Sequence, residues 1–394
     1  MIRSWKRLLV VLLAVLFIAA ACGDSDDDDG DGGTETTAAP ETTGGAETTA
    51  APETTGGAET TAAPETTGDA AGAAAVKACQ VSDTGGIDDR SFNQTAYAGM
   101  ERAEAELGAE IAFLESQDAT DFAPNIQSFI DQECDLIVTV GFLLGEDTLA
   151  ASEANPDQLF SIVDFAFFDD TGAPIEPANV RTLTFQTDQA AFLAGYLAAG
   201  MTESGVVGTY GGINLPTVSI FMEGFRNGVL YYNEQKGTDV QVLGWDGTDG
   251  LFTGNFESTD DGRAFGQNLI DEGADIILPV AGPVGLGTAA VAQEVGGVML
   301  IGVDADQFEA APEFADVFLT SIQKKMDNAV FDTVQGVAET GGLPDLAYSG
   351  TLENDGVALA PFHDFEDAVP QELKDELEQV RAGIIDGSIS VSGG

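Results

Sequence analysis

Two polar loops contain residues whose types and spacing suit the binding of a small molecule. Asp83 and the triplet Ser91-Phe92-Asn93 offer a carboxylate, a hydroxyl, an aromatic ring and an amide within eleven residues. Phe256 follows Gly254 in a second polar loop, so two rings from different parts of the chain could sandwich a flat base. Stacking of a base on an aromatic ring contributes about 1–3 kcal/mol. The alternative for either phenylalanine is a place in the core.

Two further carboxylates, Asp164 and Asp304, lie at the ends of predicted strands. Side chains at the carboxyl ends of parallel strands point into the crevice where ligands of α/β proteins bind. A carboxylate that accepts hydrogen bonds from two vicinal hydroxyls makes a strong contact. A helix N-cap or a hinge salt bridge is the structural alternative, and a pair of carboxylates could also perform acid/base chemistry in a hydrolase.

The sequence lacks the residues that most kinds of catalysis and metal binding need. His363 is the sole histidine, and no Gly-x-Ser-x-Gly motif accompanies it. Three cysteines and one histidine are too few for a zinc cluster. Asp88, Asp89 and Asp306 could suggest a metal site, but no third and fourth ligand accompanies them at a fixed spacing. We therefore expect no catalytic residues, no metal and no cofactor.

Short apolar runs alternate with helical spacing from residue 76 onward. Ala96, Met100, Ala103 and Leu107 mark one face of a helix, for example. Such alternation predicts a parallel, doubly wound α/β sheet. The rhythm restarts near residue 180, which indicates two α/β lobes facing each other across a ligand cleft, with a hinge between them. The predicted strands are 76–81, 111–114, 135–140, 159–164, 180–185, 206–209, 240–243, 275–280, 299–303, 318–322 and 357–360.

The lobe boundaries follow from this pattern. We expect residues 76–184 and 317–345 in lobe 1, and residues 185–316 and 346–394 in lobe 2. Cys79 falls on the first strand and Cys134 just before the third. These strands are neighbours in the usual order 2-1-3, so the two cysteines could form a disulfide outside the cytoplasm.

The first 22 residues have the features of a lipoprotein signal peptide. Three basic residues precede an apolar run that ends at Ala19-Ala20-Ala21-Cys22, and the run is too short to span a bilayer. We expect lipidation of Cys22. A plain signal peptide with an incidental cysteine is the alternative. Residues 23–75, with a twelve-residue repeat at 44–55 and 56–67, have the composition of a disordered acidic tether.

The charge of the remaining chain limits its partners. Residues 76–394 hold 54 of the 67 acidic residues and 11 of the 14 basic ones, which gives a formal charge of −43. Such a surface repels nucleic acid, so we expect no nucleic-acid partner.

Several segments together resemble the basic membrane protein family, lipoproteins of ABC transporters that include purine nucleoside receptors. The most specific are Asp89-Arg90-Ser91-Phe92-Asn93-Gln94 and Gly302-Val303-Asp304-Ala305-Asp306-Gln307. The resemblance covers essentially all of residues 76–394 and implies a type I periplasmic-binding-protein fold. The other matching segments are residues 82–88, 141–142, 162–164, 190–195, 273–277 and 321–324.

The resemblance also implies roles for particular residues. Phe92 and Phe256 would stack on the base, while Asp164 and Asp304 would read the base edge and the sugar hydroxyls. Lys324 matches the family's lysine near the second hinge crossing, and the glycine-rich turn at residues 281–287 would line the ligand. Gly262 would let the backbone approach the ligand. The segment after Phe256 departs from the family pattern, since relatives usually carry a proline and a lysine there.

We therefore expect a monomeric, non-enzymatic receptor, lipid-anchored on the extracytoplasmic face of the cell membrane. It would bind a purine nucleoside and pass it to the permease and ATPase of an ABC importer. A sugar or furanose receptor of the same fold, or a ligand-sensing surface lipoprotein without a transporter, is the alternative. Adenosine, guanosine and inosine differ by one or two hydrogen bonds, so the residue types leave the choice among them open.

The charge generates a first prediction. We expect the melting temperature to rise as salt is added, because counterions screen the repulsion among the surface carboxylates. A thermal melt in low and high sodium chloride measures this, and an unchanged melting temperature would contradict it.

Overall fold

The structure is a computed structural model, and it describes residues 75–169 and 171–392. The predicted signal peptide, Cys22 and the tether up to residue 74 lie outside the described residues. No helix in the described part is long and apolar enough to cross a membrane.

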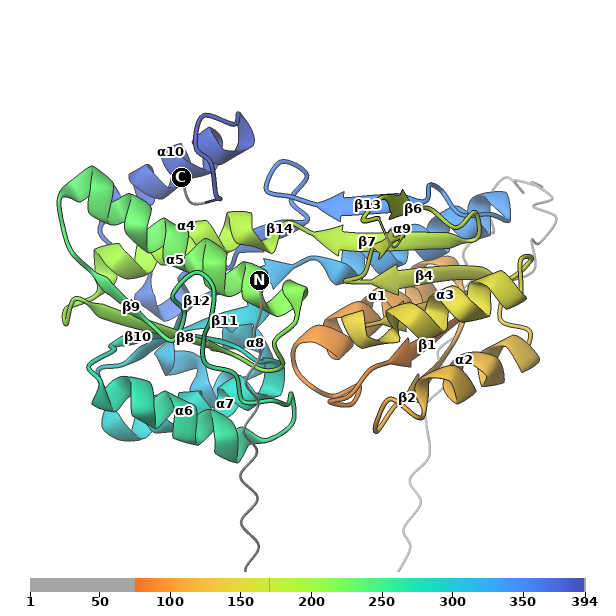
Figure 1. Cartoon of the computed structure of the whole chain (residues 1–394), viewed down its shortest axis with the longest axis horizontal. Helices are drawn as coiled ribbons and strands as arrows, with labels where there is room; N and C mark the ends of the chain where they lie inside the picture. The colour runs from red at the N-terminus through yellow and green to blue at the C-terminus, as the bar shows by residue number, and fades with distance from the viewer. Residues whose placement is uncertain (1–74, 170, 393–394) are drawn as a thin grey trace, which may run out of the picture. The chain divides into compact units, whose positions relative to one another are not determined.

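The first lobe is built on a six-stranded, wholly parallel sheet in the order β13-β7-β4-β3-β1-β2. Figure 1 shows it on the right, with helices on both faces of the sheet. A short hairpin of β5 (Phe167–Phe168) and β6 (Pro174–Ile175) follows β4. The strands are β1 (Lys77–Ser82), β2 (Glu110–Glu115), β3 (Leu136–Val140), β4 (Leu159–Val163), β7 (Val180–Phe185) and β13 (Ala347–Gly350). The helices are α1 (Phe92–Leu107), α2 (Phe122–Asp131), α3 (Gly145–Ala154) and α9 (Met326–Thr340).

The second lobe repeats this plan with the sheet order β14-β12-β11-β10-β8-β9, in which only β14 runs antiparallel to its neighbour. Its strands are β8 (Val206–Gly211), β9 (Gln241–Leu243), β10 (Ile276–Val280), β11 (Met299–Asp304), β12 (Phe318–Lys324) and β14 (Val357–Leu359). Its helices are α4 (Thr187–Met201), α5 (Pro216–Lys236), α6 (Thr259–Asp271), α7 (Gly285–Val295), α8 (Gln307–Ala310) and α10 (Gln371–Ile385). The two-lobed α/β fold predicted from the strand and helix rhythm is therefore confirmed.

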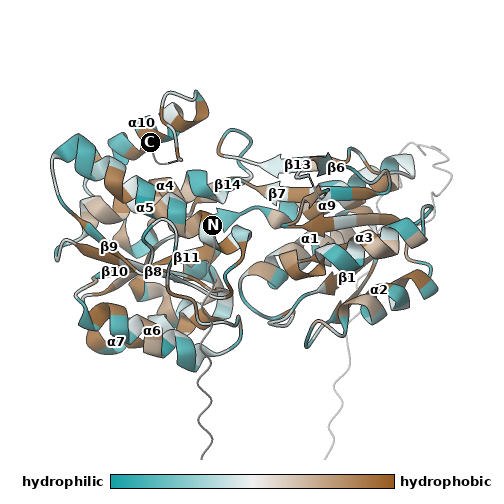
Figure 2. Cartoon of the chain, in the orientation of Figure 1, coloured by the Kyte–Doolittle hydropathy of each residue, from teal (hydrophilic) through white to brown (hydrophobic). Residues whose placement is uncertain are grey.

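The central strands explain why each lobe folds as it does. All five residues of β3 and of β10 are buried, as expected for parallel strands covered on both faces. Figure 2 shows the apolar residues gathered on the strands and the polar ones on the outer helix faces. Cys79 in β1 and Cys134 before β3 are bonded to each other, with a Cα–Cα distance of 6.1 Å. The expected order β2-β1-β3 brings them together.

The second and third crossings between the lobes come later in the chain than the sequence indicated, whereas the first follows β7 as predicted. β12 was expected in lobe 1 but pairs with β11 in the second sheet, and β13 lies in the first sheet beside β7. The crossings therefore follow β7, Lys324 and β13. As a result Lys324, the last residue of β12, stands at the hinge itself.

The helices α4 and α5 of the second lobe pack unusually closely, because a glycine of each helix lies against the backbone of the other. A Cβ on Gly195 of α4 would stand 1.9 Å from the carbonyl oxygen of Phe225 in α5. A Cβ on Gly228 of α5 would stand 2.0 Å from the carbonyl oxygen of Phe192. This contact fixes the position of α5, whose first turns reach the cleft between the lobes.

Gly195→Ala should therefore lower the free energy of unfolding by more than about 2 kcal/mol, because the added methyl forces two helices apart. Gly342→Ala is the matched control, since a Cβ there meets nothing within 4 Å. Urea denaturation of both variants measures the effect. Equal stability of the two would show that α4 and α5 adapt without cost.

Candidate functional site

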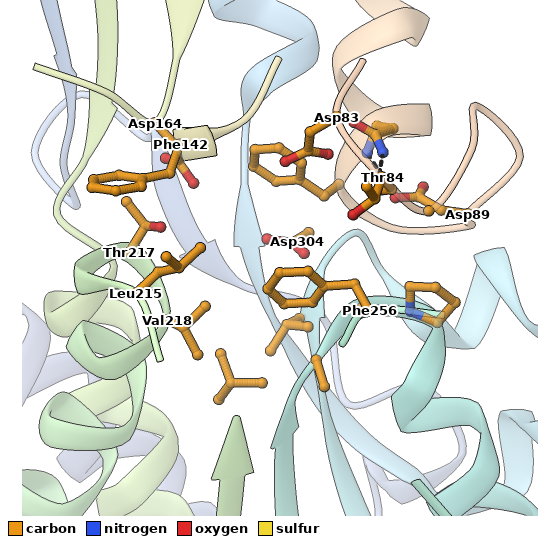
Figure 3. Close-up of a pocket in the computed structure, with 18 of the residues that line it drawn as sticks. Asp83, Thr84, Asp89, Phe142, Asp164, Leu215, Thr217, Val218, Phe256 and Asp304 are labelled. Carbon is orange, nitrogen blue, oxygen red and sulfur yellow. Dashed lines mark hydrogen bonds between the residues drawn. The ribbon is translucent and has the colours of Figure 1, made fainter. Parts of the chain in front are cut away.

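A cavity lies between the lobes, and its empty space is about 610 Å³, a volume that includes open solvent at its mouth. Its walls come from the carboxyl ends of β1, β3 and β4 in the first lobe and of β10, β11 and β12 in the second. Figure 3 shows residues of both lobes converging on it. The lining residues are Asp83, Thr84, Gly85, Asp89, Phe92, Asn93, Phe142, Asp164, Leu215, Thr217, Val218, Phe221, Phe256, Val280, Ala281, Gly282, Pro283, Val303, Asp304 and Lys324.

Asp164 and Asp304 occupy equivalent places in the two lobes. Asp164 directly follows β4 and Asp304 ends β11, and both have left-handed backbone, with φ of 64° and 66°. Few residues other than glycine adopt this conformation, although aspartate tolerates it better than most. Both carboxylates are more than nine-tenths buried, and Figure 3 shows them at the cavity.

Lys324 joins these two carboxylates. Its ammonium forms an ion pair with Asp164 Oδ2 and lies 3.7 Å from Asp304 Oδ1. It also lies 4.9 Å from the ring centroid of Phe92 and 5.1 Å from that of Phe221. Burial disfavours its charge, but Asp164 and Asp304 together raise the pKa of Lys324. Burial in turn raises the pKa of Asp164, and the Lys324 ammonium opposes that rise.

The start of α1 fixes the other polar edge of the cavity. Asp89 accepts hydrogen bonds from the backbone N–H groups of Ser91 at 2.9 Å, Asn93 at 2.8 Å and Gln94 at 3.0 Å, so it caps the helix. Burial raises the pKa of Asp89 to about 6 despite these bonds. The cap sets the position of the Phe92 ring and the Asn93 amide.

Asp83 and Asn93 are buried polar groups that line the cavity. Burial raises the pKa of Asp83 well above its ordinary value, the Asn93 amide opposes this rise, and the charges of Asp89 and Asp164 add to it. Gly141 must lack a side chain here, because a Cβ would stand 1.9 Å from Asp83 Oδ2. Within the described chain Asn93 Oδ1 has no hydrogen-bond partner. A ligand N–H that reached this oxygen would remove the cost of leaving it unpaired.

Four phenylalanine rings from both lobes contribute the apolar surface of the cavity. Phe92 and Phe142 belong to the first lobe, and Phe221 and Phe256 to the second. Gly212 makes room for Phe256, because a Cβ there would stand 2.3 Å from its ring. The cavity thus combines aromatic faces with four carboxylates and one ammonium, a composition suited to a flat ligand with hydroxyl and amide edges.

Direct contacts also join the lobes at the rim of the cleft. Ser91 Oγ donates to Asp304 Oδ2 at 2.9 Å, and Gln307 Nε2 donates to the backbone oxygen of Arg90 at 2.9 Å. Arg90 forms an ion pair with Glu313. These contacts hold the two lobes in a closed arrangement.

The structure brings most of the expected site residues together. Asp83, Phe92, Asn93, Asp164, Phe256, Asp304 and Lys324 all line the cavity, as does part of the turn at residues 281–287. Ser91 does not line it and instead bonds Asp304 across the lobes. Gly262 also lies outside the lining, because its bare Cα packs against the carbonyl oxygen of Val284, 1.8 Å from where a Cβ would be.

Several lining residues carried no clear sequence signal. Phe221, Thr217 and Val218 lie in the first two turns of α5, where apolar spacing is the same for a cavity wall as for the core. Phe142, which follows β3, is an exception: it lies in the segment 141–142 that resembles the family, although no role was predicted for it. Among the described residues no group of three or more His, Cys, Asp or Glu could hold a metal ion.

Comparisons with known proteins found similar sequences. The family model described as ABC transporter substrate-binding protein PnrA-like matches residues 76–393. The ABC transporter nucleoside-binding protein BmpA of Lactococcus lactis subsp. cremoris is 29% identical over 335 residues, which cover 80% of this chain and 89% of that protein. Basic membrane protein A of Borreliella burgdorferi is 32% identical over 247 residues, which cover 62% and 68%.

A solved structure is similar as well. The ABC transporter solute-binding protein from Aeropyrum pernix K1 has a TM-score of 0.70 at 24% sequence identity. The likeness covers 80% of this chain and 92% of that one, and it shows the fold.

The Lys324 contacts generate a prediction. Lys324→Met should lower the free energy of unfolding by about 3–5 kcal/mol, because it leaves buried Asp164 without its cation. The double variant Lys324→Met, Asp164→Asn should recover much of this loss. Lys325→Met is the control, because the Lys325 side chain is only half-buried and its ammonium donates a hydrogen bond to Gln323 Oε1. Denaturant unfolding measures all three, and equal losses in the two lysine variants would contradict the account.

Proposed function

Because the chain belongs to the family of PnrA-like ABC transporter substrate-binding proteins, we propose that it binds a purine nucleoside in the cleft and delivers it to an ABC importer. The observation that carries this proposal is the pairing of Phe92 and Phe256. The two rings come from opposite lobes and line one cavity together with Asp164 and Asp304, both strand-end carboxylates.

The base would lie against the rings of Phe92 and Phe256, where stacking contributes about 1–3 kcal/mol. Its polar edge would meet Asp164, Asp83 and the Asn93 amide. The Asn93 oxygen, which has no partner in the described chain, would accept from a base N–H. These groups supply the hydrogen bonds by which a site separates one purine from another.

The ribose would lie at Asp304 and Lys324. A carboxylate accepts from two vicinal hydroxyls, and the ammonium 3.7 Å away supplies a donor. Ser91 already bonds Asp304 from the other lobe, so the sugar contact and the closure of the lobes share one carboxylate. Ligand binding would therefore favour the closed arrangement.

The remaining parts of the proposal concern location and partners. Lipidation of Cys22 would anchor the protein at the outer face of the cell membrane, and the acidic segment up to residue 75 would act as its tether. The closed lobes would then dock, as a monomer, on the permease of the importer. The matched relative from Lactococcus lactis, named as a nucleoside-binding protein of an ABC transporter, supports this role.

Isothermal titration calorimetry with adenosine, guanosine, inosine, ribose and free bases tests the proposal. We expect a purine nucleoside to bind, and Phe92→Ala or Phe256→Ala to weaken its affinity by about 5- to 150-fold, the equivalent of the stacking energy. Phe113→Ala is the matched control, because Phe113 is 42% exposed and lies outside the cavity.

The other outcomes separate the alternatives. Binding of ribose or another sugar but no nucleoside would keep the receptor role and overturn the ligand. Release of free base from a bound nucleoside, followed by chromatography, would identify a hydrolase instead. Equal loss of affinity in Phe113→Ala would show that the effect of the cavity variants is not specific.

A further inference from the structure

We propose that the cleft contains a second, apolar chamber that accepts an apolar substituent on the base of the bound nucleoside. This inference rests on the proposed function, because it assumes a nucleoside in the main cavity. The ligand class would be purine nucleosides with an apolar group on the base edge that faces Asp164.

The chamber adjoins the ligand cavity. Phe142, Asp164, Thr217 and Lys324 line both spaces, so they form the junction between them. Figure 3 shows Phe142, Asp164 and Thr217 together at one end of the cavity, away from Asp89. A group attached to the ligand near Asp164 would pass between Phe142 of the first lobe and Thr217 of the second.

The walls of the chamber beyond this junction are largely aromatic and aliphatic. Phe165, Phe168 and Phe185 come from the first lobe, and Pro216 and Ile220 from the start of α5. The empty space beside them is about 1180 Å³, a volume that includes open solvent on the outer side of the chamber. An apolar substituent that packed against these walls would remove their surface from water, which is the main source of affinity for apolar groups.

The aromatic wall is fixed by packing. Phe165 lies between the rings of Phe142 and Phe167, with centroid distances of 5.0 and 5.1 Å. Gly145 makes room for Phe165, because a Cβ there would stand 2.3 Å from its ring. Phe168 forms the outer rim and is 60% exposed. A wall held in this way is preformed, so a substituent would bind without the cost of ordering it.

The chamber also contains an unsatisfied hydroxyl. Thr187, the first residue of α4, lines it and is 1% exposed, and its Oγ1 finds no hydrogen-bond partner in the part of the chain that the structure describes. Beyond the junction the wall has one further polar residue, Thr184, so the chamber favours apolar groups with at most a single polar atom.

Calorimetry with adenosine, N6-benzyladenosine and 5′-O-benzyladenosine tests the inference. We expect N6-benzyladenosine to bind at least about tenfold tighter than adenosine, because its phenyl ring enters the chamber. The 5′-O-benzyl compound should bind more weakly than adenosine, since it carries the same ring at the sugar end. This comparison distinguishes binding of the benzyl group in the chamber from non-specific hydrophobic binding.

Two variants fill the chamber from opposite sides. Ile220→Trp on α5 and Ala166→Phe in the first lobe change residues that line the chamber but not the main cavity. Each should abolish the gain of N6-benzyladenosine while leaving the affinity for adenosine within about threefold. Leu230→Trp is the matched control on α5, because Leu230 is 44% exposed and lies outside both spaces.

Three results would overturn the inference. N6-benzyladenosine could bind no tighter than adenosine, or its gain in affinity could survive in both filled variants. In either case adenosine would still bind and the proposed function would stand. Absence of binding by every nucleoside would overturn the proposed function, and this inference with it.

Discussion

The cleft depends on the attraction between the Lys324 ammonium and two aspartates, Asp164 and Asp304. This ammonium stands at the end of β12, where the chain leaves the second lobe for α9 in the first. From there it contacts Asp164 of one lobe and Asp304 of the other. The cavity lining contains four aspartates and this single basic residue. Without it, bringing the lobes together would bury like charges at short range, which costs several kcal/mol per ion.

The two lobes place their functional groups by the same device. Each lobe ends a central strand with an aspartate in left-handed backbone and follows the neighbouring strand with a short helical turn. Face to face, the two copies deliver carboxylates to opposite sides of one cavity. Closure is then a matter of a few contacts at the rim, such as the bond of Ser91 to Asp304. A hinge protein needs the contacts between its lobes to be few, because it must also open and release its ligand.

Much of this arrangement could be predicted from the sequence, and the remainder could not for physical reasons. The buried runs of β3 and β10 and the strand-end aspartates have strong local signals. The run of β12 is equally apolar whichever sheet it joins, so its lobe was predicted wrongly. The half-exposed strand β13 was not recognised at all. The hydrogen bond of Ser91 to Asp304 and the packing of Gly262 on Val284 join segments that are distant in the sequence. The spacing of residues within one segment does not predict such contacts.

A crystal structure of the protein grown with guanosine or adenosine is the most direct test of the central claim. We expect closed lobes, the base between the rings of Phe92 and Phe256, and the ribose hydroxyls on Asp304 beside Lys324. The ion pair of Lys324 with Asp164 should persist in the complex. A nucleoside bound outside this cavity, or a cavity in which Lys324 contacts neither aspartate, would contradict it.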